Sequence, residues 1–327
     1  MKGEYLEFLD KWMSPYAMRE AASRGRRLTE QACPMRTDYQ RDRDRIVHSK
    51  AFRRLKHKTQ VFISPDGDHF VTRMTHTLEV SLVARTISRA LKLNEDLTEA
   101  IALGHDLGHT PFGHCGERTL EDILGHFEHN EQGLRVVDVL ENGGVGLNLT
   151  YEVRDGILNH RSSGNPCTLE GKAVMLADKI AYINHDIDDA VMAGIITQKD
   201  LPKDACKLLG YTKRERINNL IADIISTSYL QPFVQQSQEY ACKMDELRNF
   251  MFEKVYFNEN KMQQIKKADK LIRLLFEYFI EHTDTLAQTG EKPEISVADY
   301  IAGMTDNYAI KMFKDIYLVD IFQETKR

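Results

Sequence analysis

The chemistry of this chain is expected at its histidines, because three of the 12 lie within ten consecutive positions, 105–114. An aspartate directly follows the first of these three histidines. Two neutral imidazoles and two carboxylates can hold one divalent ion, since the two negative charges balance the charge of the ion. Such an ion can polarise a phosphoryl oxygen and lower the pKa of a bound water. The residues that could form this set are His76, His105, Asp106 and Asp178.

A packed core is the alternative interpretation of these residues. A single histidine on an apolar helix is more often a buried core residue than a metal ligand. The doublet of His105 and Asp106 therefore proves little by itself. When His76 upstream and Asp178 downstream are considered together with the doublet, a metal site and a packed core are equally open interpretations.

Helices are expected to position these residues, because most of the sequence has a helical pattern of apolar side chains. Between 74 and 91, apolar residues such as Leu78, Leu82 and Ile87 recur with a spacing close to 3.6. Asn94 is a suitable N-cap for a second helix that runs to about 107, and Gly108 begins a loop. Further helices are expected at 116–124, 130–141, 151–159, 169–193, 213–228, 233–256, 260–284 and 296–316.

One β element is expected in this otherwise helical chain, which we assign to the all-α class. Residues 61–63 and 69–71 flank a Pro-Asp-Gly-Asp turn, a pattern typical of a small β-hairpin. We place this hairpin at about 61–73. A boundary between a core and a C-terminal helical part is expected at about 201–213.

The composition is that of an ordinary globular protein, with 42% hydrophobic residues and a net charge of −5. No charged and apolar leader opens the chain, and no apolar run approaches the ~20 residues of a spanning helix. We therefore expect a cytoplasmic protein without a membrane partner. Residues 19–58 contain 13 Lys or Arg against 5 Asp or Glu, an excess of +8. This excess favours a compact polyanion as a partner, and a solvated face with scattered ion pairs is the alternative.

Several longer sequence motifs resemble those of one protein family. The order of His76, the doublet at 105–106 and Asp178 resembles the H…HD…D pattern of the HD-domain metal-dependent phosphohydrolases. Within that group, the word HDLGHTPFGHCGE at 105–117 resembles the bacterial dGTPases. Other matching words lie at 45–56, 58–61, 73–76 and 299–306, so the resemblance covers almost the whole chain. The chain is thus similar to the deoxyguanosinetriphosphate triphosphohydrolase-like family, to which the vertebrate dNTPase with a SAM and an HD domain is related.

This resemblance implies a reaction in which water attacks the α-phosphorus of a dNTP and releases deoxynucleoside and intact triphosphate. It also implies one divalent metal ion per subunit (Mn, Mg, Fe, Co, Ni or Zn) on the four ligands named above. By position, His129 would be the proton donor to the leaving 5′-oxygen, and His109 would lie near the α-phosphate. His114 and Glu117 would form a His–carboxylate pair for acid–base catalysis, with loop stabilisation as the alternative. If Glu117 only orients His114, its loss should matter somewhat less.

The resemblance also implies five residues that contact the nucleotide. Arg73 and Lys179 would bind phosphate oxygens, for which a planar guanidinium is well suited. Tyr182 would pack under the sugar and leave no space for a 2′-hydroxyl, which would select deoxynucleotides. Asp186 and Gln60 would bind the 3′-hydroxyl. A solvated helix face is the alternative for each of them.

We expect the chain to divide into three parts. Residues 1–40 would form an N-terminal helical and basic segment, 41–210 an HD phosphohydrolase core, and 211–327 a C-terminal helical region packed on the core. The expected partners are the dNTP substrate, further copies of the chain in a homo-oligomer and, weakly, single-stranded nucleic acid. For His160 a site role and a structural role are equally open, and His185 is expected to point away from the sugar-binding tyrosine.

Two other functions compete with this interpretation. One is an HD phosphohydrolase that acts on a nucleoside monophosphate, a cyclic nucleotide or a guanosine alarmone. Alarmone hydrolases carry an added Glu-Asp pair after their doublet, whereas Leu-Gly-His-Thr follows here at 107–110. The other is a catalytically weak nucleotide-binding regulator, and the four intact ligand positions argue against it. The native metal, the preferred base, activation by a second nucleotide and the subunit number stay open.

Overall fold

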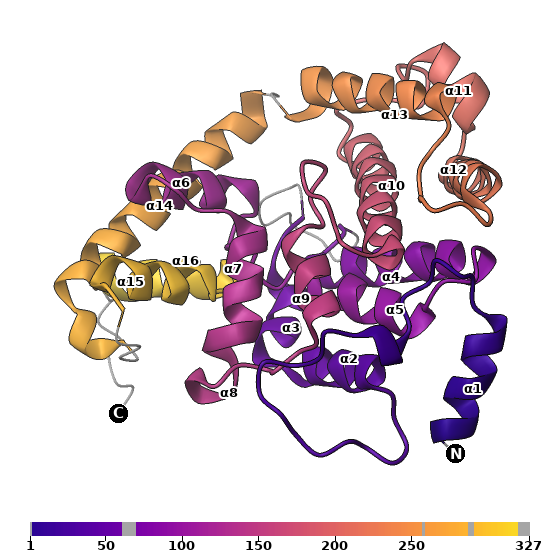
Figure 1. The fold of residues 1–327 in the computed structure, drawn as a ribbon. Coiled ribbons are helices and arrows are strands. Elements are labelled where there is room, and N and C mark those ends of the chain that lie inside the picture. Colours follow the sequence, from indigo (N-terminus) through magenta and orange to yellow (C-terminus); the bar gives the residue numbers. More distant parts are fainter. Residues whose placement is uncertain (1, 61–69, 257–258, 287–290, 320–327) are drawn as a thin grey trace, which may run out of the picture.

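Helix α10 (Leu169–Met192) is a long helix that packs against α4, α5, α9, α12 and α13 (Figure 1). The computed structural model describes residues 2–60, 70–256, 259–286 and 291–319, with backbone alone at 259–261. None of the helices in these ranges is long and apolar enough to cross a membrane. The other helices, in chain order, are α1 (Lys2–Trp12), η1 (Glu20–Ala22), α2 (Asp38–His48), α3 (Lys50–Arg54), η2 (Leu55–His57), α4 (Arg73–Ala90), α5 (Glu95–Gly104), α6 (His114–Leu124), α7 (His129–Arg135), η3 (Val136–Leu140), α8 (Glu141–Gly144), α9 (Tyr151–Leu158), α11 (Lys203–Leu209), α12 (Lys213–Ser228), α13 (Gln238–Met251), η4 (Phe252–Tyr256), α14 (Glu259–Glu281), η5 (Thr283–Thr285), α15 (Pro293–Ala302) and α16 (Asp306–Tyr317).

Side-chain caps explain where the three helices nearest the expected metal ligands begin. Thr72 caps α4 by accepting a hydrogen bond from the backbone N–H of Thr75. Asn94 caps α5 as expected, and Thr168 caps α10 in the same way. The apolar faces of the three helices then pack together in one buried cluster. Packing of these faces, more than helix propensity, holds the three helices at fixed positions.

The loop after α5 lies directly against the start of α7, because Gly108 has no side chain. A Cβ on Gly108 would lie 2.1 Å from the carbonyl oxygen of His129 and 2.1 Å from the backbone nitrogen of Gly133. Only glycine permits so close an approach of two backbones. The loop that carries the His-Asp doublet is thereby held beside the first turn of α7.

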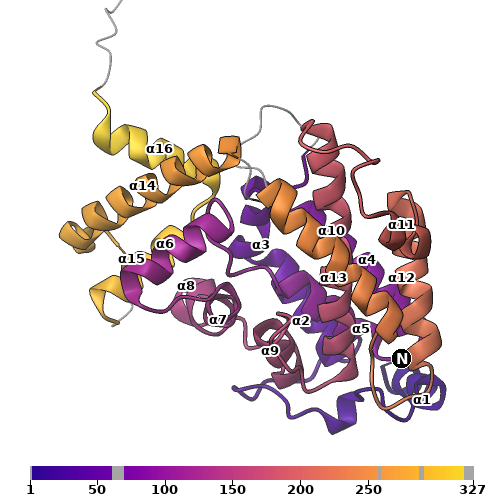
Figure 2. The same cartoon turned by 90° about the horizontal axis from the view of Figure 1, so that it is seen from above.

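Two hydrophobic clusters organise the described residues. The first joins α2–α5 and α9–α13, with buried residues such as Ile101, Ile180 and Met244. The second joins α6 to α14, α15 and α16, and includes Leu120 and Leu275. Figures 1 and 2 show the helices of the second cluster as a separate group beside those around α10. Because α11–α13 lie in the first cluster and α14–α16 in the second, the boundaries 1–40, 41–210 and 211–327 stay a prediction.

The all-α assignment is confirmed, since the described residues form helices and isolated bridges but no strand. The hairpin expected at 61–73 is not confirmed. Residues 61–69 lie outside the described part of the chain, and next to them only an isolated antiparallel bridge joins Thr59 and Thr72. Hydrophobic periodicity cannot detect so short a pairing at the entrance to a helix.

Several expected helix boundaries are wrong. The helix expected at 296–316 is two helices, because the chain is interrupted at 303–305 and Thr305 caps α16. The segment 201–213, where a boundary between core and C-terminal part is expected, contains α11, and the boundary itself stays a prediction. The helix expected from 233 begins only at Gln238, after Ser237, whose side chain caps α13. Each error lies at a cap or a short connection, where hydrophobic periodicity carries little information.

Several arginines of the basic segment 19–58 pair with carboxylates, most of which belong to the same segment. Arg26 forms an ion pair with the buried Asp42, and the guanidinium of Arg45 donates two hydrogen bonds of 2.8 Å to Glu30. Other arginines of this segment pair with Asp44 and Glu99 in the same manner. These pairs agree with an ion-paired face for the arginines concerned, but of the four carboxylates only Glu99 lies outside the segment, so the excess of +8 is reduced and not cancelled.

Candidate active site

Three of the four expected metal ligands come together from different helices. His76 lies in the first turn of α4, His105 directly follows α5, and Asp178 lies in α10. The Oδ1 atom of Asp178 is 3.1 Å from His76 Nε2 and 3.9 Å from His105 Nε2. One possible ligand atom of each residue lies within 4.8 Å of the others, so one ion could contact all three.

The fourth expected ligand, Asp106, lies beside this group. Its Oδ1 is 3.6 Å from His105 Nε2, and its Oδ2 is 3.9 Å from His76 Nε2. Oδ2 also accepts a hydrogen bond of 2.9 Å from Nη1 of Arg73. Burial would raise the pKa of the Asp106 carboxyl, but His109 and Arg73 outweigh burial and hold the pKa well below its usual range. Asp106 is therefore ionised, which is the form that binds a cation.

The hydrogen bonds of His105 leave its Nε2 available to a cation. Nδ1 of His105 is 2.7 Å from the carbonyl oxygen of Ala102, which can only accept, so Nδ1 carries the proton. The Nε2 lone pair is then buried, and it has no hydrogen-bond partner among the described residues. Such an orphaned polar atom is costly in a protein interior, and a bound cation would satisfy it. The four residues therefore fit a divalent ion.

His185, for which the sequence suggested no role, lies against His76. Its Nε2 is 2.9 Å from Nδ1 of His76. Its own Nδ1 is 2.9 Å from Oδ1 of Asp186, although the two atoms are not aligned for a hydrogen bond. A lone pair on this Nδ1 would be repelled by the carboxylate, so Nδ1 carries the proton and Nε2 accepts from His76. Contacts of this kind fix the ring orientation of a metal ligand.

The carboxylate of Glu117 connects two histidines that the sequence proposed as catalytic. Its Oε1 is 2.7 Å from Nδ1 of His129, and its Oε2 is 3.0 Å from Nδ1 of His114. Burial would raise the pKa of Glu117, but the hydrogen bonds with both imidazoles outweigh burial and hold the pKa well below its usual range. The side chain of His114 is 72% exposed, whereas that of His129 is 8% exposed. The expected His114–Glu117 contact is thus present, and His129 joins it.

His129 is enclosed by two further histidines. The ring of His109 stacks on it with 4.0 Å between centroids, and Nε2 of His109 is 3.1 Å from Oδ1 of Asp106. Nε2 of His160 is 3.2 Å from Nε2 of His129. Burial lowers the pKa of His160 to about 3, so this ring is neutral. Of the two roles left open for His160, the structure favours a place beside the site.

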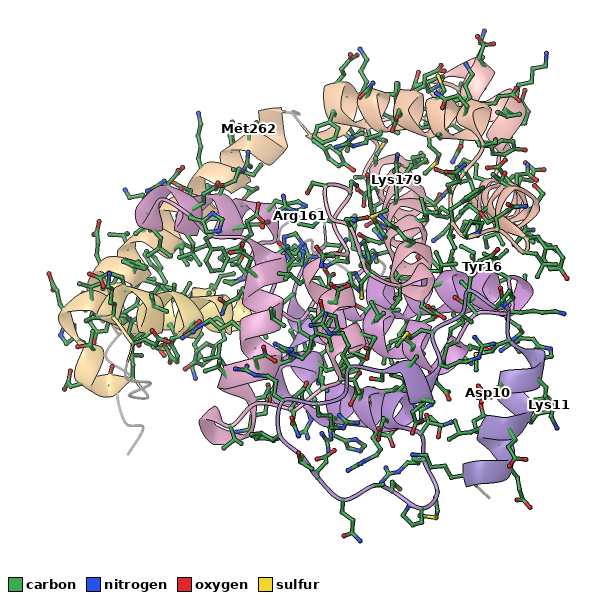
Figure 3. All side chains as sticks on the ribbon, in the orientation of Figure 1. Asp10, Lys11, Tyr16, Arg161, Lys179 and Met262 are labelled. Carbon is green, nitrogen blue, oxygen red and sulfur yellow. The ribbon has the colours of Figure 1, made fainter. Side chains whose placement is uncertain are left out.

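The residues expected to contact phosphates differ in their surroundings. Arg73 is buried, and it already holds Asp106. Lys179 lies on α10, where Figure 3 labels it. Its Nζ forms an ion pair of 2.8 Å with Asp245 of α13, so its positive charge already has a partner. Lys179 would have to leave Asp245, or share it, in order to bind a phosphate.

Two of the three residues expected to contact the sugar, Tyr182 and Asp186, lie on α10. Tyr182 is partly buried, and burial raises the pKa of its hydroxyl. Asp186 is buried, and its Oδ2 accepts a hydrogen bond from the hydroxyl of Tyr256 in η4. Gln60 is the last residue described before 61–69, and its Oε1 is buried without a partner among the described residues. The C-terminal part of the first cluster therefore reaches the expected sugar site through Tyr256.

Sequence reasoning missed four residues that touch this site or the loop between His109 and His114. These are His185, Tyr256, Lys58 and Asp306. Lys58 and Asp306 lie within the motifs at 58–61 and 299–306 that carry the resemblance. The sequence therefore marked both residues but indicated no role for either. Tyr256 belongs to no recognisable motif, and only its hydrogen bond to Asp186 of α10 shows its place.

Comparisons with known proteins show what this chain is similar to. A model of the HD domain matches residues 73–183, and a model of the phosphohydrolase-associated domain matches residues 234–315. A "Deoxyguanosinetriphosphate triphosphohydrolase-like protein" of Caldanaerobacter subterraneus subsp. tengcongensis is 55% identical, over 96% of this chain and 94% of its own length. A protein of the same name from Desulfatibacillum aliphaticivorans is 45% identical, over 94% of this chain and 95% of its own. One from Clostridium perfringens is 48% identical, over 90% and 91%.

Proposed function

Because this chain belongs to the deoxyguanosinetriphosphate triphosphohydrolase-like family of HD-domain hydrolases, we propose that it is a metal-dependent dNTP triphosphohydrolase. In the proposed reaction, water attacks the α-phosphorus, the bond to the 5′-oxygen breaks, and deoxynucleoside and triphosphate are released. One observation carries the proposal. The imidazole of His129, held by Glu117, has a nitrogen within 4.8 Å of an Asp106 oxygen, so a proton donor adjoins the His/Asp group.

The proposed ligands of one divalent ion per subunit are His76, His105, Asp106 and Asp178. When bound, the ion would polarise a phosphoryl oxygen and lower the pKa of a bound water. Mixed imidazole and carboxylate ligands suit Mn²⁺, Fe²⁺, Co²⁺, Ni²⁺ or Zn²⁺ in tight binding, and Mg²⁺ at higher concentration. Arg73 contributes by directing the Asp106 carboxylate, since its Nη1 donates to Oδ2.

His129 is the proposed general acid. Because Glu117 accepts the hydrogen of Nδ1, the nitrogen that can deliver a proton to the leaving 5′-oxygen is Nε2. The negative carboxylate also stabilises the ring while it carries both protons. Stacking on His109 and the contact with His160 limit rotation of the ring. We assign His114, on the other oxygen of Glu117, to the same acid–base group.

The nucleotide would lie along the face of α10 that carries the expected substrate residues. Arg73 and Lys179 would bind phosphate oxygens, with bidentate geometry available only to the arginine. Tyr182 would pack under the deoxyribose, and Asp186 and Gln60 would bind the 3′-hydroxyl. The unpartnered Oε1 of Gln60 supports this placement, because a substrate hydroxyl would satisfy a buried acceptor.

The test is product analysis with each of the four dNTPs and Mn²⁺ in ¹⁸O-labelled water. We expect equal amounts of deoxynucleoside and triphosphate, with the label in the triphosphate, because the attacked phosphorus stays with it. Asp106→Ala should abolish turnover and serves as the control for contaminating phosphatases.

Other outcomes would contradict the proposal. Release of pyrophosphate or orthophosphate, or turnover of only a nucleoside monophosphate, a cyclic nucleotide or an alarmone, would assign the chain to another HD phosphohydrolase. Binding of nucleotide by the metal-loaded protein without turnover of any of these substrates would identify a nucleotide-binding regulator.

A further inference from the structure

The segment 299–306 connects the C-terminal helices to both sides of the catalytic histidines. It runs from the end of α15 through a short turn to the first residue of α16. Its two carboxylates, Asp299 and Asp306, do not belong to the metal group or to the Glu117 network. Each instead holds a different element that carries a catalytic candidate.

Asp306 holds the loop between His109 and His114. Its Oδ1 accepts a hydrogen bond of 3.0 Å from the backbone N–H of Phe112. Its Oδ2 accepts bonds of 3.1 and 2.7 Å from the backbone N–H and the hydroxyl of Thr59. Asp306 is 2% exposed, so these bonds are made away from water. One buried carboxylate thus links α16, the catalytic loop and the residue before Gln60.

The loop needs this support because its backbone is strained. Phe112 has a φ of +61°, in the left-handed region that a bulky side chain rarely adopts. A residue in such a strained backbone conformation persists only where several surrounding contacts hold it in place. The bond from Phe112 N–H to Asp306 is one such constraint. Without it, the loop is expected to relax and to shift His109 and His114 relative to each other.

Lys58 adds a second link between the same loop and α15. Its side chain is buried, and its Nζ donates to the carbonyl oxygens of His109 and of Ala302, the last residue of α15. The carbonyl oxygen at the end of a helix has no partner within the helix, so Lys58 satisfies it while it holds His109. The loop is therefore tied to the end of α15 and to the start of α16.

Asp299 holds the opposite side of the catalytic group. Its Oδ1 accepts bonds of 2.8 Å from Nε of Arg135 and 2.9 Å from Nε2 of Gln132, and its Oδ2 accepts a bond of 2.8 Å from Nη2 of Arg135. Arg135 ends α7, and His129 begins it. A two-point contact between guanidinium and carboxylate fixes direction as well as distance. Asp299 therefore sets the position of α7 relative to α15.

We propose that the segment 299–306 is a brace that positions the catalytic histidines, with Asp306 and Lys58 holding the loop 109–114 and Asp299 holding α7. In this role the phosphohydrolase-associated region sets the spacing between His129 and the pair of His109 and His114. All three brace residues act through other residues and are positioning residues. Their effect on turnover rests on the proposed function, whereas their effect on the loop does not.

The experiment compares Asp306→Asn and Asp306→Ala with two controls in the full-length, metal-loaded protein. Leu275→Ala removes a buried side chain from the second hydrophobic cluster, to which α16 also belongs, and controls for a general loss of stability. Asp315→Asn removes an exposed carboxylate from the same helix and controls for charge. Three quantities are measured at a temperature at which every variant is folded. They are metal content, kcat and KM for the dNTP that the wild type hydrolyses, and hydrogen exchange of the peptide that spans 108–114.

We expect Asp306→Ala to lower kcat on the order of 10²-fold, the usual effect of misplacing a catalytic group by about 1 Å. Metal content should change little, because the metal group does not contact Asp306, and KM should change less than kcat, because Asp306 reaches Gln60 only through Thr59. Exchange of the 108–114 peptide should rise. Asp306→Asn should lie between Ala and the wild type, since it keeps one acceptor oxygen. Asp299→Ala should lower kcat without faster exchange in this peptide.

Two results would overturn the brace. One is unchanged exchange of the 108–114 peptide in Asp306→Ala. The other is an equal fall of kcat in Leu275→Ala at matched thermal stability, which would show a general packing effect. If the wild type hydrolyses no dNTP but Asp306→Ala still speeds exchange of the loop, the brace holds and the proposed function fails, so the two failures are distinguishable.

Discussion

Nδ1 of His129 lies 2.7 Å from Oε1 of Glu117, and this contact decides which nitrogen of His129 faces the His/Asp group. The backbone N–H of His129 donates to the same oxygen at 2.9 Å, so Glu117 holds both the ring and the start of α7. The sequence pointed to Glu117 only as the partner of His114. In the structure that second contact uses the other oxygen, Oε2. One carboxylate therefore serves two imidazoles.

The first prediction concerns this shared carboxylate. Glu117→Ala should lower kcat on the order of 10²–10⁴-fold, the range of general acid–base catalysis, because it releases His129 and His114 together. This reverses the expectation that loss of Glu117 matters less than loss of His114. Metal content, measured by mass spectrometry, should stay near the wild-type value in Glu117→Ala, His129→Ala and His114→Ala. A larger loss of kcat in His114→Ala than in Glu117→Ala would contradict the shared role.

The second prediction concerns the metal ligands. Asp106→Ala and Asp178→Ala should each remove bound metal together with activity, since each deletes a carboxylate that balances the charge of the ion. Metal analysis and anomalous scattering measure occupancy directly. Asp245→Ala is a suitable control, because it removes a carboxylate that pairs with Lys179 and not with the metal group. Undiminished metal in Asp106→Ala would remove that residue from the coordination sphere.

The third prediction concerns His185 as the partner of His76. Loss of a residue that orients a metal ligand typically costs about 10–100-fold in metal affinity, and we expect this from His185→Leu. His185→Gln should recover much of the affinity, because an amide oxygen can accept from Nδ1 of His76. Asn184→Ala removes a neighbouring buried polar group that pairs with Arg216 and serves as the control. Titration calorimetry with Mn²⁺ measures the affinities, and equal values for His185→Leu and the wild type would contradict this role.

The fourth prediction concerns the sugar. The wild type should prefer dGTP to GTP, and Tyr182→Ala should reduce this preference on the order of 10–10²-fold. Tyr182→Phe keeps the ring that would exclude the 2′-hydroxyl, so it should keep the preference. Rates on paired dNTP and NTP substrates measure the effect. Equal rates of the wild type on GTP and dGTP would end this assignment.

The fifth prediction follows from the buried Lys58. Burial, and after it the positive charge of Arg54, lower the pKa of this amine to about 7. Between pH 7 and about 10 the unfolded chain then binds more protons at Lys58 than the folded chain, so the stability that depends on Lys58 rises with pH. Relative to Lys58→Met, the wild type should gain up to about 4 kcal/mol in unfolding free energy over this range.

Urea unfolding of both proteins at pH 7, 8 and 9 measures this difference, and titrating groups common to both cancel. A difference that does not change with pH would show that Lys58 keeps an ordinary pKa in the folded protein.

Much of the local organisation follows from the sequence. The helices around the site could be predicted because apolar side chains recur at helical spacing and caps such as Asn94 mark where helices begin. The candidate ligands could be named because few residue types bind a divalent ion, and His105 and Asp106 stand together in a distinctive word. Both kinds of information are local: they depend on residue type and on neighbours a few positions away.

The tertiary structure alone decided which side chains share a partner. Lys58 and Ala302 are 244 positions apart, and Phe112 and Asp306 are 194 apart. No periodicity connects such residues, because their contact depends on how the two hydrophobic clusters pack against each other. The same holds for His185 on His76, 109 positions away. The sequence by itself determined the helical class and the residue types of the site, whereas packing between distant segments determined the brace, the tautomer of His76 and the shared carboxylate.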